Sequence, residues 1–499
     1  MQFKFTKFAA TLIASGIISL PLVAHANDSS ELEELRALVQ QLDQKVKILA
    51  RQGEISAEET AAVKKTTPVV KASENGFGLE SADGKNSIKL KGLLQIDNRN
   101  FSDVNGLGSD GKNISGFDFR RIRPTIEGTV FGKYDFRFTP EFGEAKTASA
   151  TSTSGIVDAY IDARFQPSFK VRAGKFKPFV GLERLQSGSD IKFIERSYVS
   201  NNILPNRDLG AAIHGDVLEG KLNYSVGIYN GVVDGGDITT VQDTNVDKEY
   251  AARFFATPFK DSDSILAGLG FGLAATHGNF KGSNTATGLP GYKTAGQQSS
   301  FFAYNTTNNA NQVPTPTTGT VYANGARNRI TPQAYYYFGP LGVISEYARV
   351  SQDVTNGTIS DKISNDAWHI SASYLLTGED ASFKGVKPKQ VFNTDGGGWG
   401  AWELVARYQE NNIDSAAFST GSGTSLTANS GYADPRINAS SAKSWATGVN
   451  WYLNQNVKVV LNYEQTSFKG GGSTTSGSFT SIADRPDEKA LFTRLQLSY

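Results

Sequence analysis

From residue 87 onward, apolar and polar side chains alternate at every second position in many short segments. In the segment 490–499, for example, one face carries Leu491, Leu495 and Leu497, and Arg494 lies on the other face. Alternation of period two predicts strands, because successive side chains of a strand point to opposite sides. A strand with one apolar and one polar face fits either a soluble β-sandwich or a transmembrane barrel. The alternation therefore predicts an all-β fold.

The first 26 residues have the composition of a secretory signal peptide. Two lysines precede a mostly apolar run over residues 8–23, and Ala24-His25-Ala26 places small residues around a cleavage position. We therefore expect export, with cleavage after Ala26. No later window contains about 20 consecutive apolar residues. A membrane location would therefore require a barrel, because only helices and closed barrels satisfy their backbone groups in lipid.

Three features favour a transmembrane antiparallel β-barrel over a sandwich: aromatic residues near the segment ends, the many segments, and a last strand that reaches the C-terminus. We count about sixteen strands in residues 87–499, an even number as in bacterial barrels. Their expected centres are residues 92, 125, 137, 160, 171, 212, 225, 253, 272, 334, 346, 372, 405, 449, 460 and 494. A barrel of about sixteen strands is too wide for side chains to fill, so an aqueous channel is expected. The predicted location is the bacterial outer membrane.

Residues 27–52 predict a short periplasmic coiled coil. Apolar residues recur there at spacings of three and four, at Leu32, Leu35, Val39, Leu42, Val46 and Leu49. Ser29 or Ser30 is the expected N-cap and Gly53 the expected end. A helix of about 20 residues is marginal alone, so this apolar seam either joins chains of an oligomer or packs on its own barrel. Residues 53–86 are expected to be a flexible linker.

Two clusters of basic residues are candidate anion sites in the lumen. The first contains Arg120, Arg121 and Arg123; strict alternation would turn Arg120 outward, so we expect either a bulge or the end of the strand there. The second cluster lies in residues 175–196, a long link after a strand that mixes apolar and charged residues. This link folds into the lumen and narrows the pore, or is an ordinary surface loop. The candidate pore-lining or anion-binding residues are Arg120, Arg121, Arg123, Arg137, Lys175, Lys177, Arg184, Lys192 and Arg196.

No pattern predicts an enzyme, a cofactor or a metal site. His214, His277 and His369 stand apart in the sequence, and no nucleophile with a nearby base stands out. There is no cysteine, so the fold uses no disulfide. Loss of the signal peptide would leave 48 of the 50 basic residues against 49 acidic ones. This balance does not indicate a partner, and no nucleic acid is expected.

Several short motifs follow one another in a characteristic order. They are Phe119-Arg120-Arg121, Ala173-Gly174-Lys175-Phe176, Phe179-Val180-Gly181-Leu182-Glu183, Glu195-Arg196, residues 374–379, residues 400–404 and residues 448–452. In these motifs the chain resembles the phosphate-selective porin O and P family over most of residues 87–499. The resemblance implies a homotrimer of sixteen-stranded channels with inward-folded loops and a path of arginines and lysines for anions.

Two departures from the family pattern bear on selectivity. Leu93 stands where the family has a pore arginine. The family's ladder of closely spaced arginines should fall in residues 277–328, a stretch that here contains only Lys281, Lys293 and Arg327 as basic residues. We therefore expect the porin function more firmly than selectivity for phosphate.

The expected function is that of an outer-membrane porin for passive diffusion of small hydrophilic solutes and ions, with a preference for anions. Two alternatives stay open: a highly selective phosphate or polyphosphate channel, and a structural protein whose coiled coil tethers the outer membrane. The expected partners are the lipid bilayer and its lipopolysaccharide, small anions or other hydrophilic solutes, and further copies of the chain in a homotrimer.

Overall fold

The computed structural model describes residues 29–73, 76–102, 113–143, 155–238, 247–298, 300–306, 319–357, 359–418, 431–472 and 482–499. The predicted signal peptide and its cleavage after Ala26 lie outside these residues. The chain divides into two compact units, one ending at Thr67 and one beginning at Pro68. None of the helices in the described ranges is long and apolar enough to cross a membrane.

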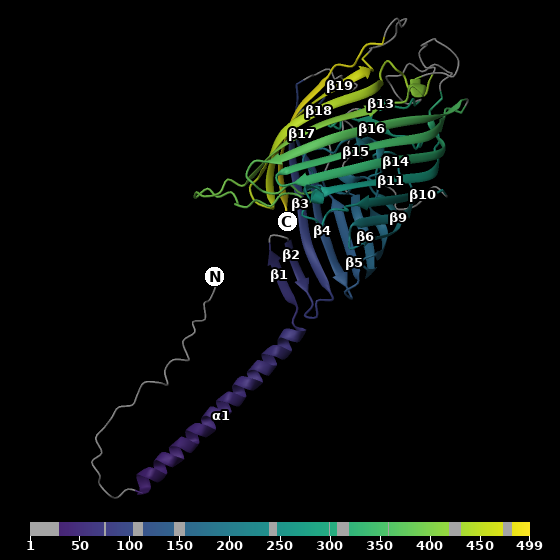
Figure 1. Ribbon diagram of the computed structural model, residues 1–499. Coiled ribbons are helices and arrows are strands. Elements are labelled where there is room, and N and C mark those ends of the chain that lie inside the picture. The colour runs from purple at the N-terminus through teal and green to yellow at the C-terminus, as the bar shows by residue number, and fades with distance from the viewer. Residues whose placement is uncertain are drawn as a thin grey trace. The chain divides into compact units, whose positions relative to one another are not determined.

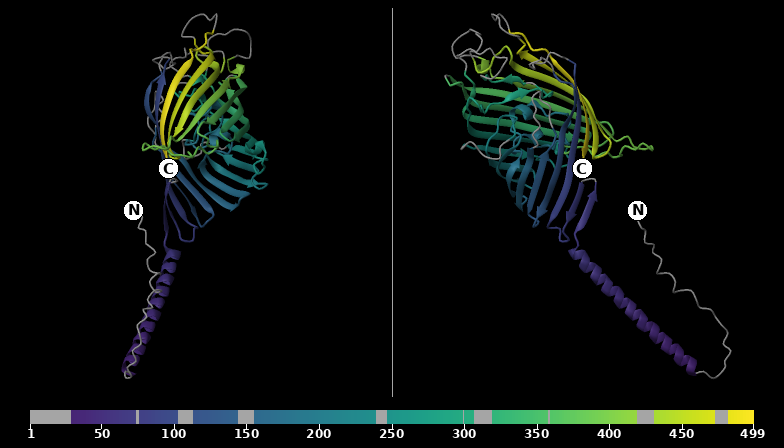
Figure 2. Two further views of the ribbon diagram at one scale, coloured as in Figure 1. Left: turned by 60° about the vertical axis from the view of Figure 1, so that its left-hand side comes forward. Right: turned by 180° about the vertical axis from the view of Figure 1, so that it is seen from behind.

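The second unit is a closed antiparallel barrel of sixteen strands (Figures 1 and 2). The strands are β3 (Ser87–Phe101), β4 (Gly116–Val130), β5 (Tyr134–Glu141), β6 (Gly155–Gln166), β7 (Phe169–Phe176), β8 (Asp208–Val217), β9 (Leu222–Tyr229), β10 (Glu249–Ala256), β11 (Leu269–Lys281), β14 (Tyr322–Phe338), β15 (Leu341–Thr355), β16 (Ser360–Leu375), β17 (Ala401–Asn412), β18 (Ala439–Tyr452), β19 (Val457–Gly470) and β20 (Glu488–Ser498). β20 pairs with β3 and closes the circle. Every predicted strand centre lies within one of these strands, so the predicted fold is confirmed.

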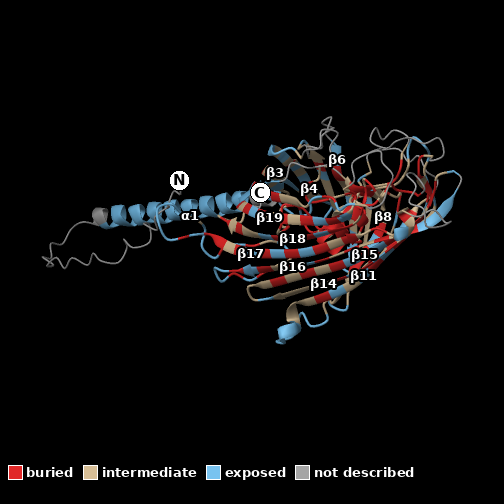
Figure 3. Cartoon of the chain, turned by 90° about the horizontal axis from the view of Figure 1, so that it is seen from above, coloured by how far each residue is buried: buried red, intermediate tan, exposed pale blue. Residues whose placement is uncertain are grey.

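The side chains alternate between the outer surface and the lumen, as the sequence predicts (Figure 3). On β20, Leu491, Leu495 and Leu497 are 42%, 50% and 40% exposed, whereas Phe492 and Arg494 are 2% and 1% exposed. The exposed face is apolar because it meets lipid, and the covered face carries the charge because an Arg facing lipid at the midplane costs about 2–4 kcal/mol.

Two rows of aromatic side chains mark the edges of the apolar band. Trp402 and Trp451 are stacked, with ring centroids 5.1 Å apart. The second row crosses β16 to β19 and contains Trp368, Tyr408, Trp445 and Tyr463. On β17 the two rows are separated by about 20 Å, at about 3.4 Å per residue. This distance runs along a strand, and strands of outer-membrane barrels tilt by about 35–45°, so the two rows are closer than this along the membrane normal.

The strands that precede the barrel correct one prediction. Residues 53–86 were expected to form a flexible linker, but β1 (Val69–Ser73) and β2 (Gly76–Glu80) form a hairpin within this range. β2 pairs with the first residues of β3, from Glu80↔Ser87 to Phe77↔Leu90. β20 pairs with the rest of β3, so β2 and β20 share one edge of the same strand.

The first unit contains helix α1 (Ser29–Thr66), 38 residues long. The helix does not end at Gly53 as expected. A single glycine costs only about 1 kcal/mol relative to alanine in a helix, and residues 54–65 are rich in Glu, Ala and Lys, which favour helix. Pro68 follows the end of the helix, because proline cannot continue it. The coiled coil stays a prediction, since the apolar seam from Leu32 to Leu49 is more than half exposed in the single chain.

Candidate functional site

Residues 177–207, here called the inward loop, join β7 to β8 and cross the lumen. The loop contains the short helix α2 (Leu182–Leu185) and a π-helix, η1 (Val199–Ile203). The backbone N–H of Ile194 donates to Asn462 on β19 at 2.8 Å, and that of Tyr198 donates to Gln409 on β17 at 2.9 Å. These partners lie on the opposite wall, so the prediction of an inward-folded loop is confirmed and the surface loop is excluded.

Apolar side chains hold the inward loop in place. Ile194, Val199, Ile203 and Leu204 are each no more than 1% exposed. Val199, Ile203 and Leu204 belong to an apolar cluster that also contains residues of β12 (Gly291–Lys293) and β13 (Ser300–Ala303). Removal of this apolar surface from water stabilises the inward position of the loop. The inward loop is therefore part of the packed structure.

An ionic anchor ties the same loop to β3 and β4. Glu195 accepts hydrogen bonds from Arg120 at 2.6 and 3.1 Å and from Arg99 at 2.7 Å. Arg120 can reach the lumen because the pairing of β3 with β4 shifts between Gln95↔Arg121 and Ile96↔Phe119, which leaves Arg120 as an extra residue. The predicted bulge at Arg120 is therefore confirmed.

Below the inward loop, at the barrel end that carries the turn between β18 and β19, the lumen opens into a cavity of about 960 Å³, here called the vestibule. Nine basic side chains line it: Lys91, Arg123, Arg137, Arg172, Lys177, Arg207, Lys384, Lys387 and Lys458. The acidic side chains of the lining are Asp158 and Asp190. The vestibule is therefore strongly cationic.

Carboxylates neutralise part of this charge. In the lining itself Arg207 donates to Asp158 at 3.0 Å, and behind it Arg172 donates to Asp162 at 3.0 Å. Lys91 and Arg137 also pair with Glu127, and Arg123 pairs with Glu141. The nine basic residues still outnumber these four carboxylates and Asp190, so the charge around the vestibule is positive.

The structure divides the nine predicted site residues into two groups. Arg123, Arg137 and Lys177 line the vestibule. The other six do not line it. All nine have partners inside the protein: Arg123 with Glu141, Arg137 with Glu127, Lys177 with the carbonyl of Gln186, Arg120 with Glu195, Arg121 with Gln95, Lys175 with the carbonyl of Ile238, Arg184 with Asn206, Lys192 with Glu403, and Arg196 with the carbonyl of Gln186. Most of these partners belong to the inward loop or to the barrel wall that the loop contacts. They satisfy the hydrogen-bonding needs of the buried basic groups.

Sequence reasoning missed Arg207, Lys384 and Lys387 as candidate site residues. The two lysines belong to the turn between β16 and β17, which folds under the barrel because Phe383 packs on a cluster that contains Leu182. A usable signal was present in the sequence, since Lys384 and Lys387 belong to a run of three lysines within six residues.

The three basic residues of the segment 277–328 do not form a row in the described structure. Arg327 is 1% exposed and donates to the carbonyls of Val232 and Gly288. Lys281 is exposed at the end of β11, and the backbone N–H of Lys293 donates to Asn202 of the inward loop at 3.1 Å. These three positions therefore do not replace the family's ladder of closely spaced arginines, as the sequence of residues 277–328 indicates.

A closed barrel with an apolar exterior, two aromatic rows and a charged, wet interior defines a channel protein of the bacterial outer membrane. The family model of phosphate-selective porins O and P matches residues 88–499. The chain belongs to this family and is an outer-membrane porin. The family and the fold of this chain are both typical of a channel protein.

Three known proteins are similar to this chain. Porin O of Pseudomonas aeruginosa is 22% identical over 416 residues, which cover 79% of this chain and 86% of that protein. Among solved structures, an anion-selective porin from Comamonas acidovorans is similar at a TM-score of 0.49 and 11% identity, over 83% of this chain and 100% of that one. The channel DcaP of Acinetobacter baumannii has a TM-score of 0.48 and 9% identity, over 85% and 99% of the two chains.

Proposed function

We propose that the protein is a diffusion channel of the outer membrane that prefers small inorganic anions over cations, with the vestibule as the region that sets this preference. The observation that carries the proposal is the lining of the vestibule, in which nine basic residues face two acidic ones. The proposal is for passive diffusion and includes no catalytic step.

The position of the vestibule beside the inward loop gives these charges their effect. Two unit charges 4 Å apart interact by about 1 kcal/mol in bulk water, but by about 4 kcal/mol at an effective dielectric constant of 20. Salt screens the interaction beyond about 8 Å at physiological ionic strength. Basic residues on a wide, wet wall therefore act weakly, whereas those beside a constriction act on every ion that passes.

Reversal of two vestibule charges tests the proposal. Lys384 and Lys387 are exposed within the vestibule, so we expect K384E/K387E to fold and to lower the anion preference. A change of about 1 kcal/mol corresponds to about a fivefold change in the anion-to-cation permeability ratio. The measurement is the reversal potential of single channels in a potassium chloride gradient across a planar bilayer.

The control carries the same change in charge at the same end of the barrel. Lys133 and Lys260 lie in the turns after β4 and β10 and do not line the vestibule. K133E/K260E should keep the permeability ratio of the unmodified protein. Equal ratios for both double variants would contradict the assignment of selectivity to the vestibule. Strong block of chloride current by low phosphate would instead favour the phosphate-selective alternative.

We further propose that the protein forms a homotrimer through helix α1. The barrels of this trimer would be in contact with the lipid and lipopolysaccharide of the outer membrane. The exposed apolar seam of α1 supports this proposal, because Leu35 and Leu42 are 65% and 54% exposed in the single chain. Burial of a leucine contributes about 1.5–3 kcal/mol. A seam of this spacing buries its leucines against the same seam of neighbouring chains.

Charges placed in the seam should weaken the trimer. We expect L35D/L42D to dissociate to monomers at a lower temperature than the unmodified protein, as measured by unboiled gel electrophoresis and light scattering in detergent. Q40D/Q44D adds the same charge outside the seam and should leave the dissociation temperature unchanged. Dissociation of both double variants at the temperature of the unmodified protein would show that the seam does not join the chains.

A further inference from the structure

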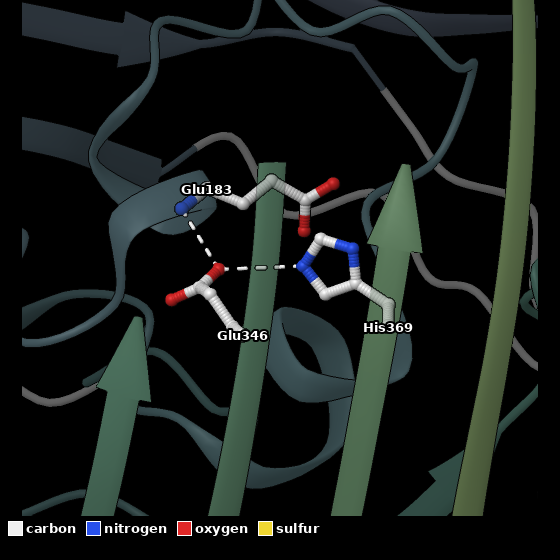
Figure 4. A group of neighbouring side chains, drawn as sticks. All are labelled: Glu183, Glu346 and His369. Carbon is white, nitrogen blue, oxygen red and sulfur yellow. Dashed lines mark hydrogen bonds and ion pairs between the residues drawn. The ribbon is translucent and has the colours of Figure 1, made fainter. Parts of the chain in front are cut away.

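Three ionisable side chains meet inside the barrel where helix α2 touches the wall (Figure 4). Glu183 comes from α2 in the inward loop, Glu346 from β15 and His369 from β16. One ligand atom of each residue lies within 4.8 Å of the others. The side chains of Glu346 and His369 are 0% exposed and that of Glu183 is 7% exposed.

Both carboxylates are held in place by other groups. Glu346 accepts the backbone N–H groups of Leu182 at 2.6 Å and Glu183 at 2.9 Å, so it caps the first turn of α2. Glu183 accepts the hydroxyl groups of Ser197 at 2.6 Å and Ser200 at 2.7 Å through Oε2. The backbone N–H of Ser197 also donates to Oε2 at 2.9 Å and to Oε1 at 3.2 Å. A carboxylate has about four acceptor positions, so one remains at Oε1 of Glu183 and others remain on Glu346.

The histidine supplies the second, independent observation. Nδ1 of His369 lies 3.1 Å from the hydroxyl of Ser371, which orients the ring. Nε2 of His369 is buried without a hydrogen-bond partner among the described residues, and Oε2 of Glu346 is 3.5 Å away from it. A buried polar atom left unsatisfied costs about 1–3 kcal/mol, and in Figure 4 this atom faces the two carboxylates.

We propose that Glu183, Glu346 and His369 bind a divalent transition-metal cation of the zinc class. One imidazole and two carboxylates are donors that such cations accept, and an imidazole oriented by a hydrogen bond on its other nitrogen is typical of a metal ligand. The cation would join the inward loop to the barrel wall.

A guanidinium is the nearest cation to the three side chains. Arg407 is 4.0 Å from Glu183 and is itself bound to Glu464 at 3.1 Å. A metal ligand must offer a lone pair, so a bound cation requires the carboxylates to be ionised and His369 to be neutral.

The test uses the full chain, purified in detergent, stripped with a chelator and titrated with zinc chloride. We expect one zinc per chain by elemental analysis. Zinc binding should weaken as the pH falls, because the cation and protons compete for the same ligand atoms. H369Q should weaken zinc binding at least 100-fold. Zinc should raise the unfolding temperature of the unmodified protein but not that of H369Q.

Two other histidines provide matched controls. His214 is buried and hydrogen-bonded to Asp162, and His277 is exposed and bonded to Asn328. H214Q and H277Q should bind zinc as the unmodified protein does. Equal affinity in all three variants would overturn the proposal, because the zinc would then lie elsewhere.

A measurement on the unmodified protein makes the test independent of how H369Q folds. Cobalt(II) in place of zinc should give an absorption band of a site with low coordination number, and zinc should abolish this band. No cobalt band together with no zinc binding would overturn the proposal. Neither result bears on the ion preference of the vestibule, which is measured separately by the reversal potential.

Discussion

Replacement of Glu195 by glutamine is expected to lower the free energy of unfolding by about 3–5 kcal/mol, the range for removal of one partner of a buried ion pair. Glu195 is the carboxylate paired with Arg120 in the described part of the chain, and it also binds Arg99. Its side chain is 2% exposed. E195Q therefore leaves the partly buried guanidinium of Arg120 without a counter-charge. The inward loop should detach from β3 and β4, and the single-channel conductance should rise.

The measurements are urea unfolding in detergent micelles and single-channel recording. E410Q is the matched control, because Glu410 pairs with Lys443 at 3.3 Å and Lys443 is 50% exposed. A pair of this kind contributes only about 0–1 kcal/mol. Should E195Q and E410Q unfold at the same urea concentration, the ionic anchor would not hold the loop, and the apolar contacts alone would do so.

Arginine in place of Leu461 is expected to cost about 2–4 kcal/mol, because the side chain would enter the middle of the bilayer. Leu461 is on the lipid-facing side of β19 and is 44% exposed. Ser467 is exposed on the same face of the same strand, beyond the aromatic row that contains Tyr463. S467R should cost about 0–1 kcal/mol, the value near an interface.

The free energy of unfolding in lipid vesicles, measured by urea titration, compares the two variants. Both substitutions add the same side chain to one strand, so a difference in their effects reports depth in the membrane. Equal costs for L461R and S467R would mean that the aromatic row at Tyr463 does not mark the edge of the apolar band.

Short-range rules were sufficient for much of the fold. Alternation located all sixteen strands, because a side chain facing lipid and one facing water must differ at every step of a strand. The bulge at Arg120 was predictable for the same reason, since a charge on the lipid face is costly. The inward loop was predictable because an exposed loop has no need for Phe193, Ile194 and Val199, which are buried here.

The candidate site was harder to predict because it depends on contacts between distant residues. Lys192 and Arg196 have the composition of anion ligands, but Glu403 on β17 and a carbonyl of the loop hold them. Lys384 is close to the vestibule only because Phe383 packs beneath the inward loop. The hairpin at residues 69–80 was missed because its strands are short and gain their stability from the edge of β3, which no local pattern reveals.

The pairing of β2 with β3 has a mechanical consequence. Only Thr67 and Pro68 separate the end of α1 from β1, so there is almost no slack between the helix and the hairpin. The hairpin is bonded to the strand at which the cylinder closes. A load on the helix therefore passes to the barrel through the backbone hydrogen bonds of this hairpin. The junction of the first and last strands is then the point where tension in the envelope would reach the pore.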